Sequence, residues 1–472
     1  MHVGLRNFSQ WRDQSEHGQA LVLGLMLIGI VILTWSSSYY IGHLVHDKMS
    51  LIRATDAAVM SAATTQARIL NFHAYLNRAQ LANQLAMMHL VTLASQERFR
   101  ATQALQSMRM NPPAFLIGMF FGSSFAASYL AAQAGGVSDS QSIRALEKAF
   151  HQHDNVIIEM LEQTRLSLLR DLSISRNQIL ERVLIRNLGD SGSIMSGNTL
   201  SELGVSYEIK RDEITNKLSY LSIQSPVWRS VFKQVMEPYG YLKPRNEVRQ
   251  NIWAVNVRCP HKRHELRRRG QSSASADGIY ESDDTISFHA VRSNRAIGCY
   301  QREYPMGWAQ VKADVRASEL VNAPKYWDRV TTSVTAGQSF SSEPFWHWVK
   351  KQGNSRWDIF NGSANQLAQS WSAPQKISWQ SRTKAGFVDV EPSRAEFRFD
   401  IDTIQKSKFL SQHMKENFLS GRFKMLGLDL KDSISASASS VTYFSRPGPR
   451  DDGLHEHPSL FHPYWHARLV SR

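Results

Sequence analysis

The sequence lacks charge in its first apolar stretch, because residues 17–46 contain no Lys, Arg, Asp or Glu. A helix that crosses a hydrocarbon core of ~30 Å needs about 20 mostly apolar residues, and residues 19–42 supply them. A soluble helix is seldom apolar on every side over such a length, and a cleaved secretory signal has an apolar core of only about 7–15 residues. The sequence therefore predicts an uncleaved transmembrane anchor at 18–46 behind a polar head at 1–17.

Cysteine is scarce as well, and the chain contains only two, Cys259 and Cys299. In an exported domain such a pair is expected to form a disulfide, whereas in a reducing compartment the two would remain separate thiols. A second hypothesis is a metal site, because Cys259, His261 and His264 offer ligands of the kind that zinc prefers. The many Arg and Lys residues around them would repel a cation, so we expect no metal and interpret the segment as a solvated basic loop closed by the disulfide.

The familiar catalytic motifs are also missing. The chain has no Gly-Lys-Ser/Thr phosphate loop and no Gly-x-Ser-x-Gly elbow, and His264-Glu265 lacks the second His of a zinc-protease helix. Asp171-Leu-Ser173-Ile-Ser175 matches a metal-dependent adhesion motif, but it lies inside a helical pattern, so we interpret it as a coincidence. These absences predict a protein with no catalytic residues and no cofactor.

The charged residues that are present suggest two further sites. Glu281, Asp283 and Asp284 could act as general acid and base, but neighbouring residues of a strand point to opposite faces, so we expect a solvated entry to a strand. The net charge of +14 includes a dense basic run at 258–269, which would suit a polyanion. This run has little aromatic interleaving, so we expect no nucleic-acid partner.

The region 47–188 is expected to be mostly helical. Residues 48–108 contain neither Pro nor Gly and are rich in Ala, Leu, Met and Gln, which favour helix. Asn111-Pro112-Pro113 should end this helix, and the charge-free segment 114–134 that follows is interpreted as a buried or membrane-surface helix rather than a second span. Apolar residues spaced eleven apart then predict a long helix with one narrow apolar stripe, packed antiparallel on the first helix.

The first long helix also carries small residues at steps of three and four, which would let a second helix approach closely. That neighbour could belong to another protein or to the core of this chain, and the sequence leaves both possibilities open. The predicted helix-docking face comprises Ala58, Ala62, Asn71, Tyr75, Asn77, Arg78 and Asn83.

The region 189–472 is expected to be rich in β-structure. Residues 285–291, 395–401 and 440–444 alternate apolar and polar side chains, as half-buried strands do. A short helix is expected at 410–418. Together these patterns predict an α+β protein: a transmembrane helix that continues into long helices forming a hairpin or stalk, then a β-rich domain with an antiparallel sheet.

Several of these segments carry a family resemblance. The start Gly18-Gln19-Ala20-Leu21 is followed, after the apolar span, by Arg53-Ala-Thr-Asp-Ala-Ala-Val-Met-Ser-Ala-Ala63 and by Leu70-Asn-Phe-His-Ala-Tyr-Leu-Asn-Arg-Ala-Gln-Leu-Ala-Asn-Gln84. Shorter islands follow at 280–287, 305–308, 443–447 and 459–469. In these segments the chain resembles the TadG-like proteins of the Flp (tight adherence) pilus-assembly system, with the N-terminal similarity extending to about residue 110.

The resemblance implies a bacterial inner-membrane protein with a single span, a cytoplasmic N-terminus and a periplasmic C-terminal body. It implies a non-enzymatic assembly role in a pilus or related secretion apparatus, with the lipid bilayer, other assembly proteins or further copies of itself as partners. Two features depart from the family. No credible counterpart of the metal-binding von Willebrand-type domain of longer TadG proteins is found, and Leu23 stands where processed pilin-like relatives carry Glu. A membrane-tethered periplasmic metal-dependent enzyme and a polyanion-binding membrane protein are the alternative hypotheses.

Overall fold

The structure is a computed structural model, and it describes most of the chain. The described residues are 17–134, 140–189, 199–214, 217–223, 225–274, 279–294, 298–314, 367–369, 377–381, 385–391, 396–406, 433–454 and 456–471. The predicted polar head and the expected helix at 410–418 lie outside these residues, except for His17, where the first helix begins.

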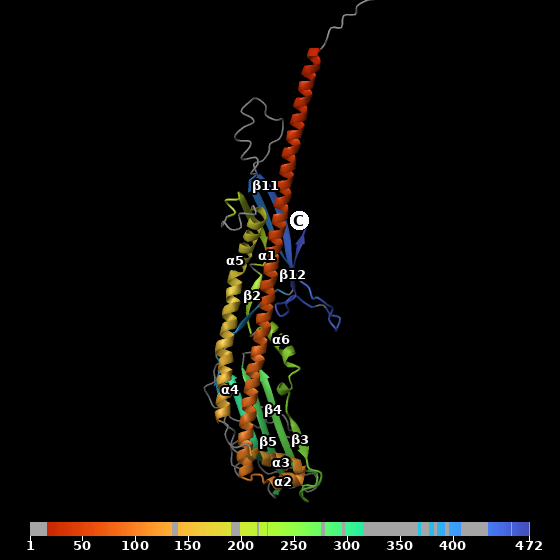
Figure 1. Ribbon diagram of the computed structural model, residues 1–472. Helices are drawn as coiled ribbons and strands as arrows, with labels where there is room; N and C mark the ends of the chain where they lie inside the picture. Colours follow the sequence, from red (N-terminus) through yellow and green to blue (C-terminus); the bar gives the residue numbers. More distant parts are fainter. Residues whose placement is uncertain are drawn as a thin grey trace, which may run out of the picture.

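One helix, α1 (His17–Met108), organises the molecule. Its first part is apolar and exposed, with Leu21 at 67% and Trp35 at 72%, and it is long enough to cross a membrane. From Leu51 onward, one side of the helix is buried in the body of the protein. Figure 1 shows the bare end of α1 rising above the body and the remainder running down its whole length.

Two short helices close the lower end of the molecule, α2 (Ala114–Phe121) and α3 (Ser123–Ala134). They meet at Gly122, whose φ of 106° suits a glycine. This pair is the predicted charge-free segment, and part of it packs on the protein, since Ala114, Ile117 and Tyr129 are buried. It lies at the opposite end of the molecule from the bare end of α1 (Figure 1).

The chain then returns along α1. The helices are α4 (Ser140–Gln152) and α5 (Ile158–Leu188), joined by the π-helical turn η1 (His153–Ile157). Leu172 of α5 shares a core cluster with Leu70 of α1, and Leu184 shares another with Ala58. Later residues of α5 therefore meet earlier residues of α1, so the two helices run in opposite directions.

Two main sheets pack along α1 instead of forming a unit beyond its end. The upper sheet is antiparallel, with the strand order β1 (Val205–Asp212), β10 (Glu396–Lys406), β11 (Ser433–Phe444) and β12 (Trp465–Val470). The lower sheet has the order β3 (Glu247–Gln250), β4 (Glu265–Ala274), β5 (Tyr280–Asn294), β6 (Gly298–Asp314) and β7 (Leu367–Gln369), with β8 (Ile377–Gln380) beside β6. Its strands β3 to β6 are antiparallel, whereas β7 and β8 run parallel to β6. The expected α+β class with a largely antiparallel C-terminal part is confirmed.

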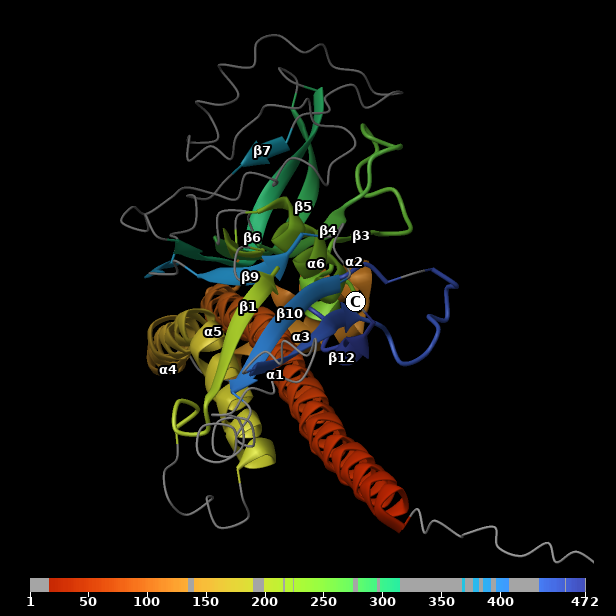
Figure 2. The same cartoon turned by 90° about the horizontal axis from the view of Figure 1, so that it is seen from above.

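Smaller elements fill the space between the two sheets. They are the antiparallel pair β2 (Leu218–Ser222) and β9 (Gly386–Val390), the helix α6 (Pro226–Met236) and the turn η3 (Gly240–Leu242). The view from above in Figure 2 shows the strands on one side of α1, with α4 and α5 beside it. One face of α1 is therefore covered by strands and by α5, and the opposite face is left open.

Candidate functional site: the two faces of the long helix

Two asparagines on α1 bind the backbone of the C-terminal segment, one half-buried and one fully buried. Asn71 donates to the carbonyl of Trp465 and accepts from its N–H, both at 2.9 Å. Asn77 donates to the carbonyls of Val388 and Leu460, both at 2.7 Å. Because these amides satisfy backbone groups of β9, of the loop before β12 and of the first residue of β12, they fix the position of the C-terminal segment on the helix.

Asn83 of α1 binds the chain where it returns along α1, at the turn between α4 and α5. Its amide oxygen lies 2.6 Å from Nδ1 of His153, at the π-helical turn between α4 and α5. The next residue of α1, Gln84, accepts a 3.2 Å hydrogen bond from the indole of Trp228 on α6. Three members of the predicted docking face, Asn71, Asn77 and Asn83, are thus occupied by groups of the same chain.

Ala58 and Ala62 are also covered from within. Both are fully buried, and they share a core cluster with Leu180 of α5 and with Phe399 and Ile401 of β10. Their small side chains let a helix and a sheet approach α1 closely. The structure thus shows the intramolecular packing that the sequence left open as one of two possibilities.

The lower sheet approaches α1 through small and hydroxyl-bearing groups. Thr102 donates to the carbonyl of Trp308 at 2.7 Å and lies 2.9 Å from its N–H. A Cβ atom on Gly307 would lie only 3.1 Å from Cβ of Gln103 and from a ring carbon of Phe99. A glycine at this position therefore lets the strand approach the helix closely.

The segments that carry the family resemblance come together along this buried face. The segment 459–469 meets Asn71 and Asn77, and the segment 305–308 meets Thr102. Thr442, next to the island at 443–447, donates to the carbonyl of Ala63 at 3.4 Å. The islands at 305–308 and 459–469, about 150 residues apart in the sequence, therefore share one structural role, which is to attach the β-structure to α1.

A buried ion pair contradicts one of our predictions. Asp283 and Asp284 were expected at a solvated strand entry, but they are only 3% and 2% exposed. Arg245 binds both carboxylate oxygens of Asp284, at 2.9 and 3.1 Å, and Ser95 of α1 donates to the same carboxylate at 2.9 Å. The prediction was wrong because the lower sheet is covered on both faces, so neither side of β5 faces water at this point.

The basic run 258–269 is likewise not a single solvated loop. Its last residues belong to β4, where Arg267 and Arg269 are buried and Arg268 is exposed. Arg267 forms an ion pair with Glu265. Alternation along the strand divides the charges between its two faces, so this part of the run does not form one basic surface.

The predicted disulfide is present. Cys259 and Cys299 are bonded at an S–S distance of 2.06 Å, and both are buried. The bond removes the thiolate that the alternative metal site required, and Nδ1 of His264 already accepts a 2.8 Å hydrogen bond from the N–H of Val291. Burial, reinforced by Arg292, lowers the pKa of His264 to about 4. Within the described part of the chain, no three His, Cys, Asp or Glu side chains are grouped as a metal site would require.

Two buried arginines on α5 were not predicted. Arg165 and Arg176 are 0% and 1% exposed and lie eleven residues apart, as do the apolar residues of the same helix. Arg176 pairs with Asp212 of β1 at 2.7 Å and stacks over the ring of Phe399 at 4.3 Å. The eleven-residue spacing applied to charged positions would have revealed this second column, which begins at the buried Asp154 of η1.

The opposite face of α1 is open and forms the main candidate docking surface. Its residues recur at alternating steps of four and three, as the core positions of a coiled coil do. This open seam consists of Arg68, Phe72, Tyr75, Ala79, Ala82, Ala86, His89, Leu93 and Gln96. All are exposed except Ala86, which is half-buried; Phe72 is 46% exposed and Tyr75 57%.

Of the predicted docking face, Tyr75 lies in the open seam, and Arg78 is exposed beside it. The spacing alone does not separate the two faces, because Ala58 lies three heptads before Ala79 in the register of the seam and is nevertheless buried. The centre of the seam consists of Ala79, Ala82 and Ala86. Because these side chains project little from the helix, a partner backbone could approach closely.

Comparison of the chain with protein-family models, with curated proteins and with solved structures gives no match.

Proposed function

We propose that this chain is a single-pass protein of the bacterial inner membrane, with a cytoplasmic N-terminus and a periplasmic body. In this proposal it is a non-enzymatic assembly component of a Flp (Tad-type) pilus or a related envelope secretion apparatus. The apolar, exposed end of α1 supports the anchor, and the disulfide supports an oxidising compartment for the body. The family resemblance supports the assembly role.

The observation that carries the proposal is the continuity of α1. The same helix supplies the anchor and, beyond Leu51, an open seam with coiled-coil spacing. A partner helix that leaves the membrane beside the anchor would meet this seam directly, with Phe72 and Tyr75 packing around its backbone over the small alanines. The chain would then act as a rigid scaffold against which other anchored subunits are aligned.

A charged double substitution tests the seam. We expect Ala79→Glu together with Ala82→Glu to reduce the recovery of co-purified partners by at least about tenfold, because burying an unpaired carboxylate costs well over 1.4 kcal/mol. Insertion into the membrane and the thermal stability of the chain should stay unchanged, since both alanines are exposed. The measurement is quantitative affinity purification from detergent-solubilised membranes of cells that make the apparatus.

A matched control separates docking from a general effect of charge. Leu166→Glu together with Ile174→Glu places the same two charges on α5, where both side chains are 53% exposed and lie outside the seam. Full recovery of partners with the control and loss with the seam variant supports the proposal. Equal recovery with both variants would show that α1 docks nothing through this face.

The state of the two cysteines tests the orientation. In growing cells we expect Cys259 and Cys299 to be oxidised, so that a maleimide-linked polymer adds to the denatured chain only after reduction. The measurement is a gel-mobility shift, combined with alkaline-phosphatase and fluorescent-protein fusions at the C-terminus. Reactive thiols without a reductant, together with a fluorescent C-terminal fusion, would place the body in the cytoplasm.

A further inference from the structure

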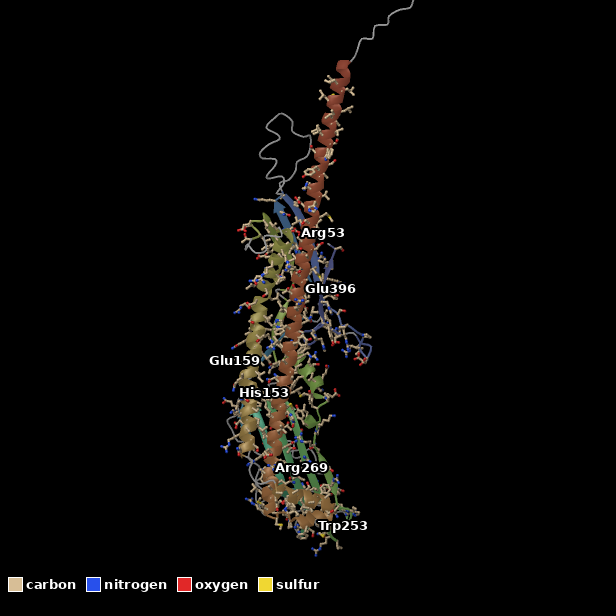
Figure 3. The ribbon with its side chains drawn as sticks, in the orientation of Figure 1. Arg53, His153, Glu159, Trp253, Arg269 and Glu396 are labelled. Carbon is tan, nitrogen blue, oxygen red and sulfur yellow. A yellow bond between two sulfur atoms is a disulfide. The ribbon has the colours of Figure 1, made fainter. Side chains whose placement is uncertain are left out.

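The lower end of the molecule is built from two segments that are distant in sequence. One is 108–134, which holds α2 and α3, and the other is the loop 251–264 between β3 and β4. They touch through the rings of Phe120 and Trp253, whose centroids are 6.0 Å apart, and Arg249 lies over the ring of Phe125 at 4.6 Å. We call these two segments the tip, and Figure 3 marks Trp253 there.

The tip exposes large apolar side chains to an unusual degree. Ile252 is 89% exposed, Val257 92% and Phe115 71%. Five others accompany them, each between 42% and 60% exposed, namely Met108, Met110, Met119, Leu130 and Trp253. Soluble surfaces commonly carry single apolar residues, but a group of this size marks an interaction site.

The protruding loop is held in place by the fold. Cys259 is bonded to Cys299, which pairs with Ser293 beside the turn of the β5–β6 hairpin. The amide of Asn251 donates to the carbonyl of Trp253 at 2.6 Å, and that of Asn256 donates to the hydroxyl of Ser293 at 3.1 Å. Ile252 and Val257 are therefore presented on a braced loop, and the entropy lost on binding is correspondingly reduced.

The charge of the tip has one sign. The two segments contain Arg109, Arg258, Lys262 and Arg263 and no acidic residue. A basic surface of this kind attracts anionic phospholipid headgroups. Trp253 adds the aromatic group that favours the boundary between headgroups and acyl chains.

We propose that the tip is a membrane-binding surface that inserts Ile252, Val257 and Phe115 into an anionic phospholipid bilayer. Nearly bare, protruding side chains suit a fluid partner, which can close around them, better than a folded protein, which would need a preformed pocket for each. The bilayer is one other than that of the anchor, because the helical stretch from Asp47 to Met108 separates the two ends by roughly 90 Å. The chain would thereby connect two membranes, a property beyond the proposed assembly role.

The test uses the full chain with its anchor enclosed in a lipid nanodisc, so that only the body can reach added vesicles. We expect flotation with vesicles of phosphatidylglycerol and phosphatidylethanolamine, and much weaker flotation with phosphatidylcholine. Ile252→Ser with Val257→Ser should reduce the bound fraction by at least about tenfold, since the substitutions remove the apolar groups that would enter the bilayer. Arg109→Glu, or a rise in salt, should weaken binding to the anionic vesicles only.

The control is Leu454→Ser, which removes an apolar side chain of 65% exposure from the loop between β11 and β12. It should bind vesicles as the unchanged chain does. Binding that resists the tip substitutions, or no binding at all, would overturn the proposal. Association of the nanodiscs with one another in the absence of vesicles, abolished by the tip substitutions, would also overturn it and make the tip a contact between copies. Seam variants should bind vesicles normally, so this result is separable from that of the proposed function.

Discussion

Replacing Arg245 by methionine is expected to lower the free energy of unfolding by about 3–5 kcal/mol, the usual cost of leaving a buried charge without its partner. Asp284 is 2% exposed and, among the residues that the structure describes, would keep only the hydroxyl of Ser95 from α1 as a side-chain donor to its carboxylate. The loss should therefore loosen the lower sheet from α1. The measurement is urea unfolding of the detergent-solubilised chain, followed by near-ultraviolet circular dichroism of its buried tryptophans.

Arg249→Met is the matched control. Its guanidinium pairs with Glu247 on the same stretch of chain, but both side chains are about half exposed, and an exposed pair contributes only about 0–1 kcal/mol. A second variant, Arg245→Met with Asp284→Leu, removes both charges and should recover most of the stability. If Arg245→Met unfolds no more readily than Arg249→Met, the buried pair is not what fastens the sheet.

The elements that the sequence predicted best are those with long, uniform patterns. The stretch 48–108 has no residue that breaks a helix, so α1 follows from composition alone. The strand patterns at 285–291 and 440–444 fall within β5 and β11. Cys259 and Cys299 could be paired because there were only two cysteines to pair.

The elements that escaped prediction depend on what covers each face. Periodicity shows which residues share a side of an element, but it does not show what lies against that side. Ala58 and Ala79 are equally small, yet one is buried under α5 and β10 and the other faces outward. Asp284 and Arg269 appeared solvated because charged residues are seldom fully buried unless they are paired. Their burial follows from tertiary packing that local patterns do not encode.

The segments quoted for the resemblance contact one another along α1. The asparagines of the segment 70–84 bind the backbone of the C-terminal island, and Thr102 binds the strand at 305–308. A hydrogen bond from a side-chain amide to a backbone N–H or carbonyl requires an Asn or Gln on the helix. On the strand, a residue of almost any type can supply the backbone group, provided that it lies in the right place.

Lowering the pH is expected to destabilise the protein through His73 on α1. This side chain is 0% exposed, and burial, reinforced by Arg165 of α5, lowers its pKa from 6.5 to about 4. Arg165 is itself paired with Glu162. Above pH 6.5 the ring is neutral in both the folded and the unfolded state. As the pH falls from 6.5 toward 4, only the unfolded chain gains the proton, so the free energy of unfolding should fall by about 2 kcal/mol by roughly pH 5.

His73→Leu should remove that part of the pH dependence, because leucine keeps the site filled and binds no proton. The measurement is the difference in urea-unfolding free energy between roughly pH 7.5 and pH 5, in the variant and in the unchanged chain. The comparison must be made between variants, since the lowered pKa of His264 acts in the same direction and the raised pKa of Asp389 acts in the opposite one. His89→Leu, at an exposed position of the same helix, should leave the dependence intact. An equal acid sensitivity in His73→Leu and His89→Leu would mean that His73 reaches water and takes up its proton in the folded state.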